Sequence, residues 1–218
     1  MSRRLKLLGT AIAVAAFSVV LVAQASAAEF KFASAPTWLE GIQVTKHELA
    51  VSGGVVKCST VEFKSTAAIS STSAFSVEVH PTYVSCRLAG TVVSVVTTSC
   101  SYVLSVNVGG VPLGGLAEIK CSGATSMEIK VPGVCSISVP SQSHSSSTVS
   151  PNSYAVSYTS MTGAVEEVLV QNQVTGLNYG TSGGVCGAGG SNGTYSGTTL
   201  VGGYKSNTFS EPHAINVS

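Results

Sequence analysis

The chain has 218 residues, of which 44% are hydrophobic and 10% charged, so it can build a sizeable core and does not have the composition of a disordered chain. Eleven basic and ten acidic residues give a net charge of +1, and no basic patch is visible, which argues against nucleic acid as a partner. All ten acidic residues are glutamate, which excludes an aspartic protease dyad and deprives a serine protease triad of its usual aspartate.

The first 27 residues have the pattern of a secretory signal peptide. Three basic residues in Arg3–Lys6 precede an apolar run over Leu7–Val22, and Ala25–Ala27 matches a cleavage site. The apolar run is short for a membrane span of about 20 residues. We therefore predict export and cleavage, which leave residues 28–218 as a secreted or cell-envelope protein without a membrane span. Loss of the three basic residues leaves eight against the ten acidic ones, a net charge of −2.

Alternation of apolar and polar residues, which is typical of half-buried strands, dominates the exported part. Leu39–Val51 could be read as a helix, but Gly41 and the β-branched residues favour a strand. Pro132-Gly133 separates two alternating segments and predicts a hairpin turn. The alternating segments are Phe75–Val79, Val103–Val108, Met127–Val131, Cys135–Val139, Tyr154–Tyr158 and Val168–Val174. We expect an all-β fold of roughly ten to thirteen strands, arranged as an antiparallel β-sandwich.

Six cysteines lie in the exported part, and no two have C-x-x-C spacing, so a zinc site or a thioredoxin-like redox centre has no support. Outside the cytoplasm such cysteines form disulfides, which favours three bonds over the alternative of buried free thiols. Fifteen connectivities are possible. Because a short loop is closed at a smaller cost in chain entropy, we expect the pairs Cys58–Cys86, Cys121–Cys135 and Cys100–Cys186.

Three segments are predicted to be irregular. Residues 108–116 could separate two sub-domains, although the odd number of cysteines on each side favours one unit. Ser141–Ser153 is rich in serine and is expected to be an exposed loop. Gly180–Gly203 contains ten glycines, and we expect a long loop there, held down by a disulfide of Cys186. Its glycines match neither a dinucleotide-binding motif nor a P-loop, so no cofactor is predicted.

Ser182 is the candidate nucleophile of a hydrolase. Gly180–Gly184 matches G-x-S-x-G, but no helix follows it, and it resembles the G-D-S-G-G of chymotrypsin-like proteases with Thr181 in place of aspartate. The base would be His47 or His80, and the third member a glutamate. A glycine-rich turn is the simpler interpretation.

Glutamates offer a second route to hydrolysis, because glycosidases place two carboxylates across a sugar. Glu166 or Glu167 could pair with Glu118 or Glu128, but solvated charges on strand faces are the simpler interpretation of all four. The four histidines have no spacing that selects a metal, and no metal site is predicted.

Several segments resemble a loose group of uncharacterised secreted bacterial proteins that contain cysteines and are all-β. The resemblance rests on the exported start and on short motifs around the cysteines, and it implies no activity and no functional residues. The motifs are Tyr83–Cys86, Cys100–Tyr102, Cys121 with Cys135–Pro140, and Cys186-Gly187 with Asn192–Gly197.

We expect a non-enzymatic extracellular or cell-envelope module that binds or packs against a partner, with no catalytic, cofactor or metal residue. Trp38 and seven tyrosines, among them Tyr179, Tyr195 and Tyr204, could stack on sugars or pack in the core. A cell-surface glycan or a protein is therefore the partner to consider, and a secreted hydrolase is the alternative.

Overall fold

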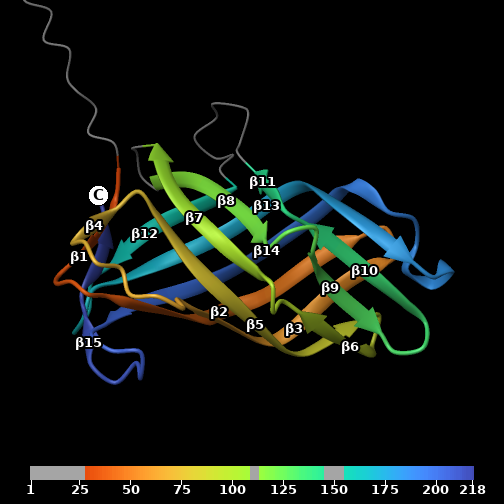
Figure 1. The fold of residues 1–218 in the computed structure, drawn as a ribbon, viewed down its shortest axis with the longest axis horizontal. Helices are drawn as coiled ribbons and strands as arrows, with labels where there is room; N and C mark the ends of the chain where they lie inside the picture. Colours follow the sequence, from red (N-terminus) through yellow and green to blue (C-terminus); the bar gives the residue numbers. More distant parts are fainter. Residues whose placement is uncertain (1–27, 109–112, 145–154) are drawn as a thin grey trace, which may run out of the picture.

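The computed structural model describes residues 28–108, 113–144 and 155–218 (Figure 1). The predicted signal peptide lies outside the described residues, as do 109–112 of the predicted boundary and 145–153 of the serine-rich run. Within the described part, no helix is long and apolar enough to cross a membrane.

The described residues form sixteen strands and one short 3-10 helix, η1. In chain order they are β1 (Phe30–Phe32), β2 (Trp38–Val51), β3 (Gly54–Lys64), β4 (Ser73–Ala74), β5 (Ser76–Leu88), β6 (Thr91–Val96), β7 (Cys100–Val108), β8 (Leu113–Cys121), β9 (Ser126–Val131), β10 (Cys135–Pro140), β11 (Gln142–His144), β12 (Val156–Met161), β13 (Glu167–Ser182), η1 (Gly184–Cys186), β14 (Gly190–Tyr204), β15 (Pro212–His213) and β16 (Ile215–Val217).

The main sheet closes into an antiparallel barrel of eight strands, in the order β8, β12, β13, β14, β2, β3, β5 and β7, which returns to β8. The all-β prediction is confirmed, and the predicted sandwich is wrong. Both architectures bury one face of each strand, so alternation alone does not distinguish them. Long strands decide the outcome: β13, β14, β2 and β5 have 16, 15, 14 and 13 residues, enough for the sheet twist to bring its edges together.

The barrel is elongated (Figure 1). Five of its strands, β13, β14, β2, β3 and β5, belong to two closed rings of paired strands. At one end β7, β8 and β12 complete the ring, and β12 pairs with Glu167–Asn172 of β13. At the other end β6, β9 and β10 close it a second time, and β10 pairs with Gly180–Ser182 of β13. Strands from both sides of residues 108–116 therefore belong to the same barrel.

Inward-facing side chains fill the barrel. On β13, Val168, Val170 and Val174 are buried as the alternation predicts, and the predicted hairpin of β9 and β10 forms around Pro132-Gly133. A separate three-stranded sheet of β16, β1 and β4 packs against one end, where the rings of Phe30 and Tyr158 meet edge to face at 5.3 Å.

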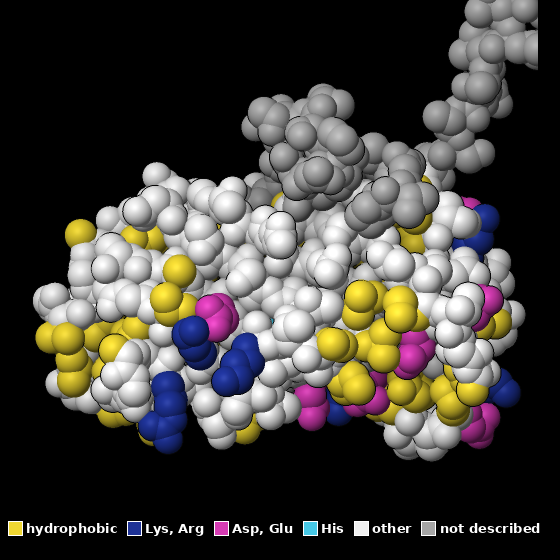
Figure 2. All heavy atoms as spheres, turned by 180° about the vertical axis from the view of Figure 1, so that it is seen from behind, with side chains coloured by type: hydrophobic (Ala, Val, Ile, Leu, Met, Phe, Trp, Pro, Cys, Tyr) yellow, Lys and Arg dark blue, Asp and Glu magenta, His cyan; other side chains and the backbone are white. Residues whose placement is uncertain are grey.

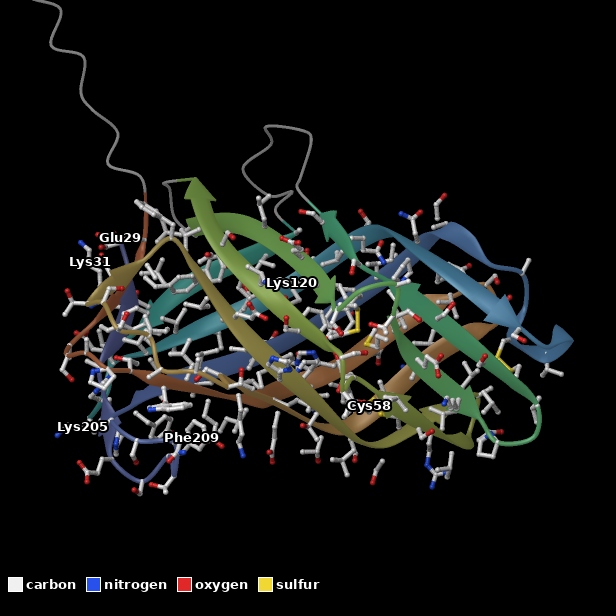
Figure 3. All side chains as sticks on the ribbon, viewed as in Figure 1. Glu29, Lys31, Cys58, Lys120, Lys205 and Phe209 are labelled. Carbon is white, nitrogen blue, oxygen red and sulfur yellow. A yellow bond between two sulfur atoms is a disulfide. The ribbon has the colours of Figure 1, made fainter. Side chains whose placement is uncertain are left out.

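All six cysteines are bonded, as Figure 3 shows for the sulfur–sulfur bonds drawn in yellow. The pair Cys58–Cys86 is confirmed, but the two other predicted pairs are wrong: the bonds are Cys100–Cys121 and Cys135–Cys186. The first two bonds join residues directly opposite each other on neighbouring strands, and this register cannot be read from loop length. Three disulfides indicate an oxidising, extracellular environment.

The predicted long loop at Gly180–Gly203 is also wrong, because β13 runs to Ser182 and β14 begins at Gly190. Several glycines of β14 lie where a neighbouring side chain covers the backbone. A Cβ atom at Gly197 would be 2.5 Å from the His47 ring, and one at Gly203 would be 2.8 Å from His213. Glycine is used here for close packing within a strand rather than for a loop.

Candidate functional site

The predicted serine hydrolase set is not assembled. Ser182 is exposed at the end of β13, opposite Ser136 of β10. His47 is buried inside the barrel and contacts Thr199, whose strand partner Val170 lies twelve residues before Ser182 on β13. At about 3.3 Å per residue, these twelve residues span roughly 40 Å of strand, so Ser182 and His47 are far beyond hydrogen-bonding distance. His80, opposite Lys64, lies toward the same end of the barrel as Val170.

The predicted glutamate pair is not assembled either. Glu128 forms an ion pair with Lys130 of its own strand at 2.9 Å, and Glu166 accepts a hydrogen bond from Asn216 at 3.0 Å. Glu118 lies on β8, so these carboxylates are distributed over separate strands and both ends of the barrel. In the part of the chain that the structure describes, no three His, Cys, Asp or Glu side chains gather as a metal site would require.

A chain of polar side chains crosses the barrel interior. His47 is 1% exposed; its Nδ1 lies 2.6 Å from the Tyr195 hydroxyl and its Nε2 lies 3.1 Å from Thr199 Oγ1. The Tyr195 hydroxyl is 3.1 Å from that of Tyr83, which is 2.9 Å from that of Tyr102. Tyr195, one of the tyrosines considered for sugar stacking, is thus part of the core.

Burial keeps these hydrogen-bonded side chains uncharged. Desolvation lowers the pKa of His47 to about 4, against a smaller raising effect of a backbone hydrogen bond at Thr198. Desolvation also raises the pKa values of Tyr83, Tyr102 and Tyr195 well above their usual range. Both partners of the neutral His47 imidazole, Tyr195 and Thr199, are themselves buried, so His47 is a satisfied core group rather than a base that a substrate could reach.

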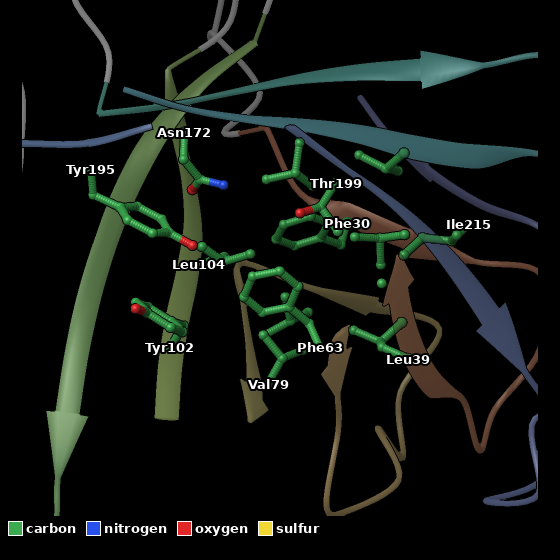
Figure 4. A pocket seen from close by; sticks show the side chains of 15 residues that line it. Phe30, Leu39, Phe63, Val79, Tyr102, Leu104, Asn172, Tyr195, Thr199 and Ile215 are labelled. Atoms are coloured by element: carbon green, nitrogen blue, oxygen red, sulfur yellow. The ribbon is translucent and has the colours of Figure 1, made fainter. Parts of the chain in front are cut away.

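Several small cavities lie inside the described part of the barrel, and Figure 4 shows the side chains that line one of them. Three of them, with volumes of about 30, 20 and 20 Å³, are strung around Tyr195. Asn172 lies between the first two and turns its amide toward them. Each volume suits one or two waters, whereas a benzene-sized ligand needs about 150 Å³. These three cavities are therefore large enough for ordered water but not for a ligand of that size.

Tyr195→Phe should reveal how much this row of hydrogen-bonded interior side chains contributes to the free energy of unfolding. The substitution removes the hydroxyl that joins His47 to Tyr83 and leaves both partners buried, so we expect the free energy of unfolding to fall by about 1–3 kcal/mol. Urea titration of the oxidised protein measures this. Tyr204→Phe is the matched control, with an expected change within about 0.5 kcal/mol because Tyr204 is only partly buried. Equal losses in both variants would contradict the assigned role of Tyr195.

A much larger hollow lies on the outer wall of the barrel, over β2, β3 and β5. Its volume is about 540 Å³, and three cations line it. Figure 2 shows Lys and Arg side chains gathered beside a single acidic one on this side of the molecule. The lining residues are Lys46, Val55, Lys57, Cys58, Ser59, Ser85, Arg87, Ala89 and Gly90. We call this hollow the basic groove.

A bulge in β2 places Lys46 at the groove. Ile42 pairs with Glu62 and His47 pairs with Cys58, so four residues of β2 face three of β3 between these pairs. The extra residue interrupts the pairing and changes the direction in which side chains point. As a result His47 turns into the barrel, and Lys46 beside it is exposed at the groove.

The groove carries a local excess of positive charge. Lys57 and Arg87 are directly opposite on β3 and β5, and like charges in this position repel each other. Glu48 neutralises only Lys57, at 2.7 Å, while Arg87 donates a hydrogen bond to the Gly90 carbonyl at 2.8 Å. Of the eight cations in the described ranges, Lys46 and Arg87 are two of the three that form no ion pair. An anion bound there would relieve the repulsion.

The structure corrects the expectation that the protein has no basic patch, because it brings three cations together in the groove. Lys46, Lys57 and Arg87 are separated by 11 and 30 residues, so only the register of three strands brings them together. No family model, curated protein or solved structure matches the chain. Its function is therefore inferred from its own surface.

Proposed function

We propose that the protein is an exported β-barrel module that binds an anionic ligand in the basic groove. The observation that supports this proposal is that two cations, Lys57 and Arg87, lie directly opposite each other on adjacent strands. Lys46 lines the same groove, and Glu48 forms an ion pair with Lys57 alone. Three disulfides and the predicted signal peptide support a location outside the cytoplasm.

The chemistry of the groove favours carboxylate, sulfate or phosphate groups. The Arg87 guanidinium keeps free N–H donors beyond the one bound to Gly90, and such a fork matches the oxygens of these anions. Ser59 and Ser85 also line the groove and add hydroxyl groups to it. Of the two partners considered from the sequence, we favour a cell-surface glycan that carries acidic groups.

Binding to a sulfated polysaccharide tests this proposal. We expect residues 28–218 to be retained on immobilised dextran sulfate at low salt and released as ionic strength rises, because salt screens exposed charges. The double variant Lys46→Gln/Arg87→Gln should bind at least about tenfold more weakly, since each charge-assisted contact contributes about 1.5–3 kcal/mol. Lys57 is kept so that Glu48 retains its partner.

The matched control is Lys120→Gln/Lys205→Gln, which removes the same charge from sites outside the groove. It should bind within about twofold of the unmodified protein. If both double variants lose affinity equally, only net charge matters, and the assignment of the groove is wrong.

A further inference from the structure

A second polar cluster lies at the barrel end where β1 and β15 meet, the end at which Figure 3 labels Lys205 and Phe209. Ser34 follows β1, Thr37 precedes β2, and His213 lies on β15. The Ser34 hydroxyl is 3.1 Å from His213 Nδ1, and Thr37 Oγ1 is 2.8 Å from His213 Nε2. One imidazole thus joins two hydroxyls that belong to the other end of the chain.

The hydrogen bonds fix where the protons lie. Thr37 Oγ1 donates its only proton to the Ser34 carbonyl oxygen at 2.6 Å, so toward His213 it can only accept. His213 Nε2 therefore carries the proton of the neutral ring, and Nδ1 presents its lone pair. The Ser34 hydroxyl then donates to Nδ1, as a serine does to the base that activates it.

The three side chains differ in exposure as a nucleophilic site requires: the histidine base is buried and fixed in place, whereas the serine is partly exposed. Thr37 is 0% and His213 8% exposed, whereas Ser34 is half-buried between the exposed Ala33 and Ala35. Gly203 lies against the His213 ring, where a Cβ atom would be 2.8 Å from Cδ2, so the ring has little freedom to turn. Burial, aided by the Lys205 charge, lowers the pKa of His213, which keeps it in the basic form at neutral pH.

We propose that Ser34 is a nucleophile that accepts an acyl group from an ester, with His213 as its base and Thr37 as the residue that orients His213. Ser34 Oγ forms a bond to the ester carbonyl carbon, and its proton moves to His213 Nδ1. The bond from that carbon to the alcohol oxygen breaks, and His213 returns the proton to the departing alcohol. The products are acyl-Ser34 and the free alcohol. This site is independent of the basic groove and of the function proposed for it.

Labelling with a fluorophosphonate, a reagent for activated serines, tests the proposal. The Ser34 oxygen displaces fluoride from phosphorus, so the intact mass should rise by one phosphonyl group, and peptide mapping should place that group on Ser34. Ser34→Ala should abolish labelling, whereas Ser210→Ala should not change it, because Ser210 is exposed and bonded only to Thr208. An unlabelled wild-type protein, or a label that survives Ser34→Ala, would overturn the proposal.

Two further variants separate a catalytic base from a structural histidine. His213→Gln should slow labelling about 100-fold or more, in line with the usual contribution of a general base. Thr37→Val should slow it, and Thr37→Ser, which restores the hydroxyl, should recover most of the rate. The labelling rate of the wild type should fall on acidification with a midpoint below pH 6.5, since burial lowers the pKa of His213. Variants that melt like the wild type and label at its rate would show that His213 only packs.

Discussion

Removal of the Cys135–Cys186 disulfide is expected to lower the free energy of unfolding by about 4 kcal/mol. The bond closes a loop of 51 residues, the longest of the three, and the chain-entropy model gives about this value for that length. It also ties η1 to the start of β10, and Cys186 is completely buried. The double substitution Cys135→Ala/Cys186→Ala avoids a free thiol, and its melting temperature should fall by about 10 °C.

Urea titration and thermal melting without reductant measure this effect. Loops of 28 and 21 residues predict smaller losses, of about 3.6 and about 3.3 kcal/mol, for the alanine pairs that replace Cys58–Cys86 and Cys100–Cys121. Proteolysis should also begin in the variant at residues 183–189, which join β13 to β14 around η1. A Cys135→Ala/Cys186→Ala protein that melts like the wild type would show that this bond does not restrain the chain.

Alternation predicted the strands well because burial inside a barrel repeats every second residue. Val168, Val170 and Val174 lie inside as expected, and the turn at Pro132-Gly133 joins two paired strands. The closure of the sheet was not predictable in this way, because it depends on which distant strands become neighbours. The high glycine content of residues 180–203 predicted a loop and so concealed the pairing of β13 with β14, both of which lie partly in this segment.

The polar clusters were harder to predict from the sequence than the strands. His47 was considered as the base for Ser182, yet it contacts Tyr195, 148 residues away. Ser34 and His213 are 179 residues apart, and no local motif marks either of them. The bulge that exposes Lys46 needs one extra residue in β2 relative to β3, which only a known register reveals. The sequence separation of two residues on different strands does not indicate whether their side chains are in contact.

Acidification should reduce the stability of the barrel by about 3 kcal/mol through His47 alone. Its pKa is about 4 in the folded protein and near 6.5 when unfolded, so the unfolded chain binds more protons between these values. Stability therefore falls as pH decreases from 6.5 to 4, by about 1.4 kcal/mol per pH unit, and is restored as pH rises. Below pH 4 both states are protonated, and this contribution stops growing.

Urea titrations at half-unit steps from pH 7.5 to 4.5 measure the slope, and His47→Asn should flatten it by about 1.4 kcal/mol per unit below pH 6.5. The range stops at 4.5 because Glu78, whose pKa is lowered chiefly by the Ser101 hydroxyl, adds acid sensitivity below that pH. His213 also has a lowered pKa, so His213→Asn is the control that measures its separate share. If His47→Asn keeps the slope of the wild type, the imidazole is not held neutral, and water must reach it inside the barrel.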